Sequence, residues 1–141
     1  MRLAACLLAI AAAASWAVDT KPAPPSAATV SGKLIVHEGQ AAELQTGDGK
    51  TVQLDGDEPT RKVLGDSRLN GFQVEAHGHF TDSGHFLIDP IHTHSFLVRK
   101  DGKLKLVTYW CDVCSIRAYT PGPCVCCQRE TTLDLRDPDQ Q

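Results

Sequence analysis

The ten residues GFQVEAHGHF (71–80) alternate between apolar and polar side chains. One predicted face carries the apolar set Phe72, Val74, Ala76 and Phe80, and the other carries the polar set Gln73, Glu75, His77 and His79. A period of two is typical of a β-strand that buries one face and leaves the other in water. The stretch therefore predicts a half-buried strand, with further strands expected on both sides of it.

Three strand-like segments precede this stretch: VSGKLIVHE (30–38), AAELQT (41–46) and TVQLD (51–55). The last two are joined by GDGK (47–50), whose residues tolerate the positive φ of a tight turn. Between the third segment and residue 71, Pro59 near a first turn and Gly65 as a stop predict a short helix over 58–65. The N-terminal half is thus expected to be a three-strand meander followed by one short helix.

After the central stretch, the turn TDSG (81–84) leads into HFLIDPIHTHSFLV (85–98), which predicts a strand that Pro90 bends. An Asp-Gly turn then leads into KLKLVTYW (103–110), another alternating strand, and TTLDL (131–135) is a weaker strand signal. The sequence therefore predicts strands almost throughout, with no internal repeat.

The order of three strands, a short helix and two strands resembles the OB-fold, and the phrase LNGFQVEAHG (69–78) looks like the fourth strand of many such barrels. The resemblance implies a fold class and no particular function. We predict a mainly β chain in which a small OB-like five-stranded barrel with one short helix spans 29–98. A C-terminal β-hairpin and cysteine-rich, metal-binding-like extension then spans 99–136, before a disordered tail over 137–141.

The N-terminus reads as an export signal. Residues 1–17 combine a short charged start, an apolar run and small residues before a cleavage position, which predicts a signal peptide that is removed. The Pro/Ala-rich segment 18–28 is expected to be a linker. Nothing downstream approaches the ~20 apolar residues of a membrane-spanning helix. The expected location is therefore outside the cytoplasm, periplasmic or secreted.

The charge argues against a nucleic-acid-binding protein, and the missing catalytic motifs argue against an enzyme. The formal net charge of −3 provides no basic footprint for nucleic acid. Nucleophile elbows, H-E-x-x-H zinc motifs and phosphate-cradling glycine loops are all missing from the sequence, so we do not predict an enzyme. A binding or structural role with an unknown protein partner remains, and Tyr109 and Trp110 are either its contact residues or packing residues between extension and barrel.

Five of the six cysteines lie in CDVCSIRAYTPGPCVCC (111–127). Cys111 and Cys114 form one C-x2-C pair, Cys124 and Cys127 form a second, and Cys126 is an extra thiol inside the second pair. Two such pairs are the usual way to place four thiolates around zinc at about 2.3 Å, and Pro121-Gly122-Pro123 can reverse the chain between them. The spacing predicts a four-thiolate zinc site, with Cys126 as an additional candidate ligand.

Other uses of these thiols stay open. In an oxidising compartment the same cysteines could form structural disulfides in an interaction module without metal. Copper(I) is a second candidate ion because it also prefers soft thiolates. A periplasmic metal chaperone that uses both histidines and cysteines is a further alternative. So is a thiol redox protein, in which Arg117 or Arg129 could stabilise a thiolate. Haem attachment is excluded because Ser115, not histidine, follows Cys114.

The cysteine tail also carries a family resemblance. The segments YWCDVC (109–114) and YTPGPCVCCQ (119–128) look like the ends of a group of exported bacterial OB-fold-like proteins with no established activity. The resemblance therefore implies export and a shared architecture, and it implies no mechanism.

The histidines provide a weaker candidate site. His77 and His79 share the polar face of their strand, and His85 would lie opposite His79 if the following turn paired Phe80 with Gly84. The three imidazoles could then form a second zinc or copper site, or simply be solvated surface residues. His92 and His94 are expected to be hydrogen-bonded residues at the barrel rim.

Overall fold

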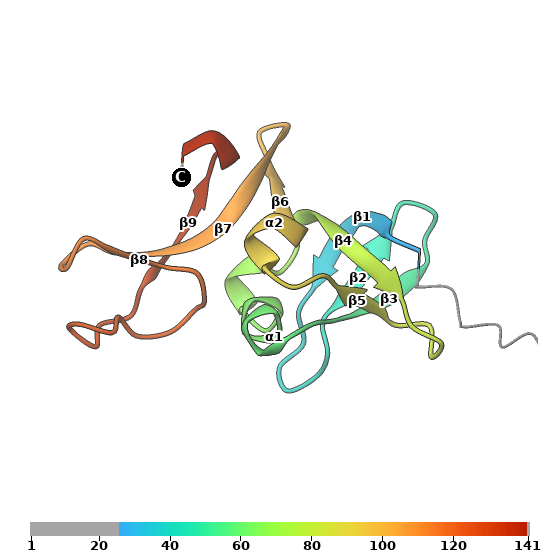
Figure 1. The fold of residues 1–141 in the computed structure, drawn as a ribbon, viewed down its shortest axis with the longest axis horizontal. Coiled ribbons are helices and arrows are strands. Elements are labelled where there is room, and N and C mark those ends of the chain that lie inside the picture. The colour runs from blue at the N-terminus through green and yellow to red at the C-terminus, as the bar shows by residue number, and fades with distance from the viewer. Residues whose placement is uncertain (1–25, 141) are drawn as a thin grey trace, which may run out of the picture.

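The computed structural model describes residues 26–140, so the predicted signal peptide 1–17 and most of the predicted linker 18–28 lie outside the described residues. The nine strands of this part of the chain form one sheet, whose first part closes into a barrel and whose C-terminal part extends away from it (Figure 1). In this part of the chain, no helix has the length and apolar character needed to cross a membrane.

Five strands close the barrel: β1 (Ala28–Ile35), β2 (Glu43–Thr46), β3 (Thr51–Asp55), β4 (Gln73–Phe80) and β5 (Phe86–Ile88). They pair in the order β1-β2-β3-β5-β4, and β4 returns to β1 to complete the circle. All of these pairs are antiparallel except β3 with β5, which is parallel. The predicted small OB-like barrel is therefore confirmed.

β4 is paired along both edges, and the predicted alternation holds over most of it. Val74 and Ala76 are buried while Glu75 and His77 face outward. Phe80 is the exception, because it is 48% exposed at the end of the strand, where its ring packs edge-on against Phe86 with centroids 5.0 Å apart. The apolar face of β4 thus forms one wall of the core.

Two glycines allow the barrel strands to approach closely. A Cβ atom on Gly78 would lie 2.0 Å from the Leu87 carbonyl oxygen, and one on Gly32 would lie 2.3 Å from that of Gln45. Any other residue would force the paired strands apart at these points. The tight curvature of the barrel therefore depends on these two positions.

The predicted short helix is present as α1 (Glu58–Leu64), which begins after Asp57 and ends at Gly65. The Asp57 carboxylate accepts a hydrogen bond from the Thr60 amide at 2.9 Å, an N-cap that satisfies a free donor of the first turn. Val63 and Leu64 are buried against the barrel. A 3-10 helix of one turn, η1 (Ser67–Leu69), then leads the chain into β4.

The segment 85–98 differs from the single bent strand predicted for it. β5 ends at Ile88, the one-turn helix α2 (His92–Ser95) follows, and β6 (Phe96–Lys100) returns to pair with the first half of β4. Pro90 has no amide hydrogen for a sheet ladder, and Ile91 adopts φ +66. Together these residues break the strand instead of bending it.

The C-terminal sheet is built around β7 (Lys103–Cys111), which pairs with β6, β8 (Ile116–Ala118) and β9 (Thr132–Arg136). Its inner face carries Val107, Tyr109 and Leu133 onto the barrel core. Within the tail 137–141, Pro138–Gln140 form the 3-10 turn η2. Lys105 donates to the Asp137 carboxylate at 2.6 Å, which holds the start of that tail.

Arg68 joins the barrel to the C-terminal extension. Its Nε donates to the buried Asp66 carboxylate at 2.9 Å, and its Nη1 donates to the carbonyl oxygen of Thr131 at 2.7 Å. The guanidinium also lies over the Tyr109 ring, 5.0 Å from the centroid. Burial raises the pKa of the Asp66 carboxyl, but hydrogen bonds from the Arg68 side chain and amide outweigh it and hold that pKa below its usual range.

Replacing Arg68 by alanine should lower the free energy of unfolding by about 2 kcal/mol, because it leaves a buried carboxylate unpaired and a carbonyl without its donor. Arg99→Ala is the matched control, since Arg99 pairs with Glu75 at 3.5 Å on a more exposed face and should cost less than about 1 kcal/mol. Urea unfolding of both variants measures the difference. Equal losses would contradict the role given to Arg68.

Candidate metal centre

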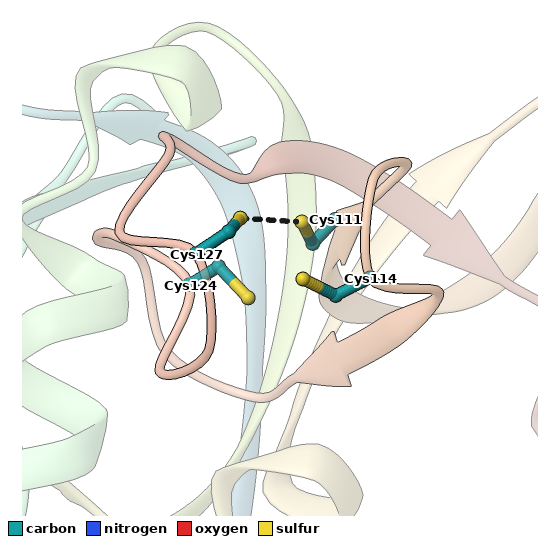
Figure 2. Close-up of side chains that lie close together, drawn as sticks. All are labelled: Cys111, Cys114, Cys124 and Cys127. Atoms are coloured by element: carbon teal, nitrogen blue, oxygen red, sulfur yellow. Dashed lines mark hydrogen bonds between the residues drawn. The ribbon is translucent and has the colours of Figure 1, made fainter.

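The sulfur atoms of Cys111, Cys114, Cys124 and Cys127 converge on one point (Figure 2). All four Sγ atoms lie within 4.8 Å of one another, and those of Cys111 and Cys127 are 3.5 Å apart. A tetrahedral ion with metal–sulfur bonds of ~2.3 Å needs sulfur–sulfur edges of about 3.8 Å. The cluster is therefore of the right size to hold one metal ion.

The first turn is the tip of the hairpin between β7 and β8. β7 ends at Cys111, which pairs with Ile116 across the hairpin, and residues 112–115 form the connection. Ser115 adopts φ +54, which reverses the chain directly after Cys114. The amides of Cys114 and Val113 act to lower the pKa of the Cys111 thiol, so they favour its charged form. Both side chains of this pair are thereby directed toward the second pair.

The second turn repeats this design. An isolated bridge joins Pro123 to Glu130, the Cys124 amide donates to the Arg129 carbonyl at 2.7 Å, and the turn closes between them. Gln128, directly after Cys127, adopts φ +60 and donates its amide to the Cys124 carbonyl at 2.9 Å. In each turn, the residue after the second cysteine is thus in the left-handed region.

The amides of the second turn also favour the charged form of its first cysteine. Hydrogen bonds from the Cys127 and Cys126 amides lower the pKa of the Cys124 thiol to about 7. The neighbouring Cys126 and Cys127 thiols raise the pKa of Cys114. For Cys111, burial and the other sulfurs outweigh the amide of Cys114, so its pKa is raised as well. Four thiolates this close repel one another, and a cation between them removes that cost.

Burial divides the five thiols. Cys111 and Cys124 are buried at 1% and 3% exposure, Cys114 and Cys127 are half-buried, and Cys126 is exposed. None of these five cysteines forms a disulfide. Cys126, predicted as an additional candidate ligand, is not one of the four converging sulfurs, although its thiol is near enough to Cys114 to influence that residue's pKa.

The structure does not assemble the predicted histidine site. Phe80 pairs with Phe86, not with Gly84, so His79 lies opposite Leu87, and the carbonyl of His85 accepts from the Thr81 amide. Within residues 26–140, the four cysteines are the one group of three or more potential ligand side chains that gathers around a point. The longer turn therefore separates His85 from His77 and His79.

The strand histidines have other partners. The His77 ring lies 3.0 Å from the Thr29 hydroxyl and 3.3 Å from the Glu75 carboxylate, and His79 lies 3.7 Å from Asp89. His92, expected at the rim, is buried, and its Nε2 lies 2.7 Å from the Tyr119 carbonyl oxygen. That contact connects α2 to the segment that leads into the second cysteine turn.

The two aromatic residues before Cys111 have different positions. Tyr109 is completely buried, and burial together with the neighbouring Asp66 raises its pKa. Trp110 lies on the other face of the sheet, where the Arg117 guanidinium is 5.0 Å from its ring centroid. Tyr109 is therefore a packing residue, while Trp110 remains available to a partner.

Glycine at the left-handed positions should stabilise the cysteine turns. Ser115→Gly and Gln128→Gly should each raise the free energy of unfolding by about 0.5–1 kcal/mol, because a left-handed conformation costs an L side chain that much or more. Asp112→Gly, in the same hairpin but without a positive φ, should lower it through the added freedom of the unfolded chain. Thermal unfolding of the three variants compares them, and stabilisation by Asp112→Gly as well would remove the conformational explanation.

No family model matches the chain, and no curated protein or solved structure matches it either. The likeness of the cysteine tail to exported bacterial proteins stays a prediction.

Proposed function

We propose that the protein is a non-enzymatic binding or structural module whose C-terminal extension is organised by a zinc ion on Cys111, Cys114, Cys124 and Cys127. The single observation that carries this proposal is the convergence of the four sulfurs within 4.8 Å of one another, from two turns of the same design. Two C-x2-C turns facing one another are the usual framework of a structural zinc site.

Zinc is favoured over copper(I) by the number and arrangement of the sulfurs. Four thiolates in a tetrahedral arrangement are typical of zinc or of iron–sulfur sites, and zinc needs no cofactor assembly. The amides directed at Cys111 and Cys124 support this choice, because hydrogen bonds to bound thiolates fix their orientation. Copper(I) remains the second candidate ion.

A structural role follows from the ligand set. Catalytic zinc sites keep one position open for water or substrate, whereas here protein sulfur would take all four positions. Residues 119–130, between β8 and β9, form a single isolated bridge and no strand or helix. The ion would therefore stabilise this segment, as the hydrophobic core stabilises the barrel.

The proposed location is outside the cytoplasm, in the periplasm or in the secreted fraction, and it rests on the signal-like composition of residues 1–17. Thiols in such a compartment are exposed to oxidants. Binding to zinc protects the four thiolates, because the nucleophilic sulfurs are then occupied. The proposal includes an unidentified protein partner, because a module without catalytic activity works by binding another molecule.

Metal analysis of protein isolated from its native compartment tests the proposal. We expect about one zinc per chain and a single thiol that reacts before chelation, with the other four reacting after it. Cys114→Ser and Cys127→Ser should lose the zinc and lower the melting temperature, because each removes a ligand. Cys126→Ser is the matched control and should retain both.

Three outcomes would contradict the zinc assignment. Intact mass after alkylation that shows two disulfides and no metal favours the disulfide-stapled module instead. Stoichiometric copper that is transferred to a chelating acceptor favours a metal chaperone. Zinc loss in Cys126→Ser equal to that in Cys114→Ser would mean that the ligand set is wrong.

A further inference from the structure

The outer face of the C-terminal sheet carries a polar hollow of about 420 Å³. The pairing register brings its residues together, because Trp110 lies opposite both Arg117 of β8 and Thr132 of β9. The side chains and backbone that line the hollow come from all three strands: Trp110, Arg117, Thr132, Leu133, Asp134 and Arg136. None of them is a cysteine of the metal centre, so the inference does not rest on the proposed zinc.

The charges in this hollow do not balance. Arg117 donates to the Asp134 carboxylate at 3.0 Å, which compensates one guanidinium. Arg136 forms no ion pair with any residue of the described segment 26–140. Two guanidiniums and one carboxylate leave a single positive charge, which one carboxylate from outside would neutralise.

Each of the two arginines also has one donor without an acceptor. The Nε atoms of Arg117 and Arg136 are covered and have no hydrogen-bond partner. A donor that is shielded from water and unpaired is costly, and such groups call for a physical explanation. These covered Nε atoms are out of reach of a ligand in the hollow, but the terminal nitrogens of a guanidinium that lines it can offer an oxyanion two parallel N–H donors.

Trp110 makes the site more specific than a pair of surface arginines. The Arg117 guanidinium lies over its indole ring, which restricts the orientation of the donors before any ligand arrives. Tryptophan and arginine are the residues most often found at the energetic centre of protein interfaces. The indole of Trp110 provides the apolar flank that a peptide side chain needs.

We propose that this hollow binds a carboxylate side chain of an acidic segment in a protein partner. A nucleic acid is disfavoured as the occupant because a polyanion needs several unpaired cations along its path, whereas the chain has a net charge of −3 and the hollow has one such cation. The single uncompensated charge fits a single carboxylate.

Fluorescence anisotropy with the full chain and a labelled octapeptide of alternating glutamate and valine tests the proposal. We expect saturable binding, and a peptide with glutamine in place of glutamate should not bind. Arg136→Gln should weaken binding about tenfold, the size expected for the loss of one charge-assisted hydrogen bond. Arg136→Lys, which keeps the charge, should recover part of the affinity.

Arg129→Gln is the matched control, because Arg129 is an exposed arginine of the same extension outside the hollow. It should bind the peptide like the wild type. Both glutamine variants should keep the wild-type melting temperature and metal content, so that a binding loss is separable from unfolding or from failure of the zinc site.

Several results would overturn the proposal: equal binding of the glutamate and glutamine peptides, equal losses in Arg129→Gln and Arg136→Gln, or no binding at all. A further one is displacement of the peptide by millimolar inorganic phosphate or by an oligothymidylate that binds more tightly. That result would mean that the hollow selects phosphate oxygens instead of a carboxylate.

Discussion

The structure depends on β4 being paired along both of its edges. On one side it holds β1 over six residue pairs, which closes the barrel. On the other side β5 takes its second half and β6 takes its first half, so one strand edge serves two partners. β6 then carries the chain out to β7. The barrel and the extension are therefore two parts of one continuous hydrogen-bonded sheet, and the strand break at Ile91 is what makes the shared edge available.

The continuous sheet fixes the strands that lead into and out of the cysteine turns. β7 runs from its pairing with β6 directly to Cys111, and β9 returns beside it from the second turn. Arg68 adds a connection across the junction, since it reaches from the barrel to the carbonyl of Thr131, whose hydroxyl in turn donates to the Gly122 carbonyl at 2.8 Å. Both chains that enter and leave the metal centre are held before any ion binds, so the four sulfurs meet with little further ordering.

Local patterns predicted the parts of this structure that local interactions determine. The alternation over 71–80 identified β4, and the two C-x2-C pairs identified the four sulfurs that converge. The length of the turn after β4 was harder to predict, because turns of three and five residues have similar sequences, and the assumption of three residues placed His85 opposite His79. The role of Arg68 depends on a partner 63 residues away, and no local pattern encodes that. The residues with positive φ in the cysteine turns are Ser115 and Gln128. Their left-handed conformation could not be predicted from the sequence, because glycine is the residue that usually marks such a position.

The short span of the metal centre has a kinetic consequence. Cys111 and Cys127 are 16 positions apart, whereas the contact between Thr29 and His77 that accompanies barrel closure spans 48. Loop entropy rises with span, and long-range strand pairing is the slow step in all-β domains. The short loop of the cysteine segment can thus close before the N-terminal strands have formed their long-range pairs. In the proposed zinc-bound form, the ion would close this short loop without waiting for the longer-range pairing of the barrel.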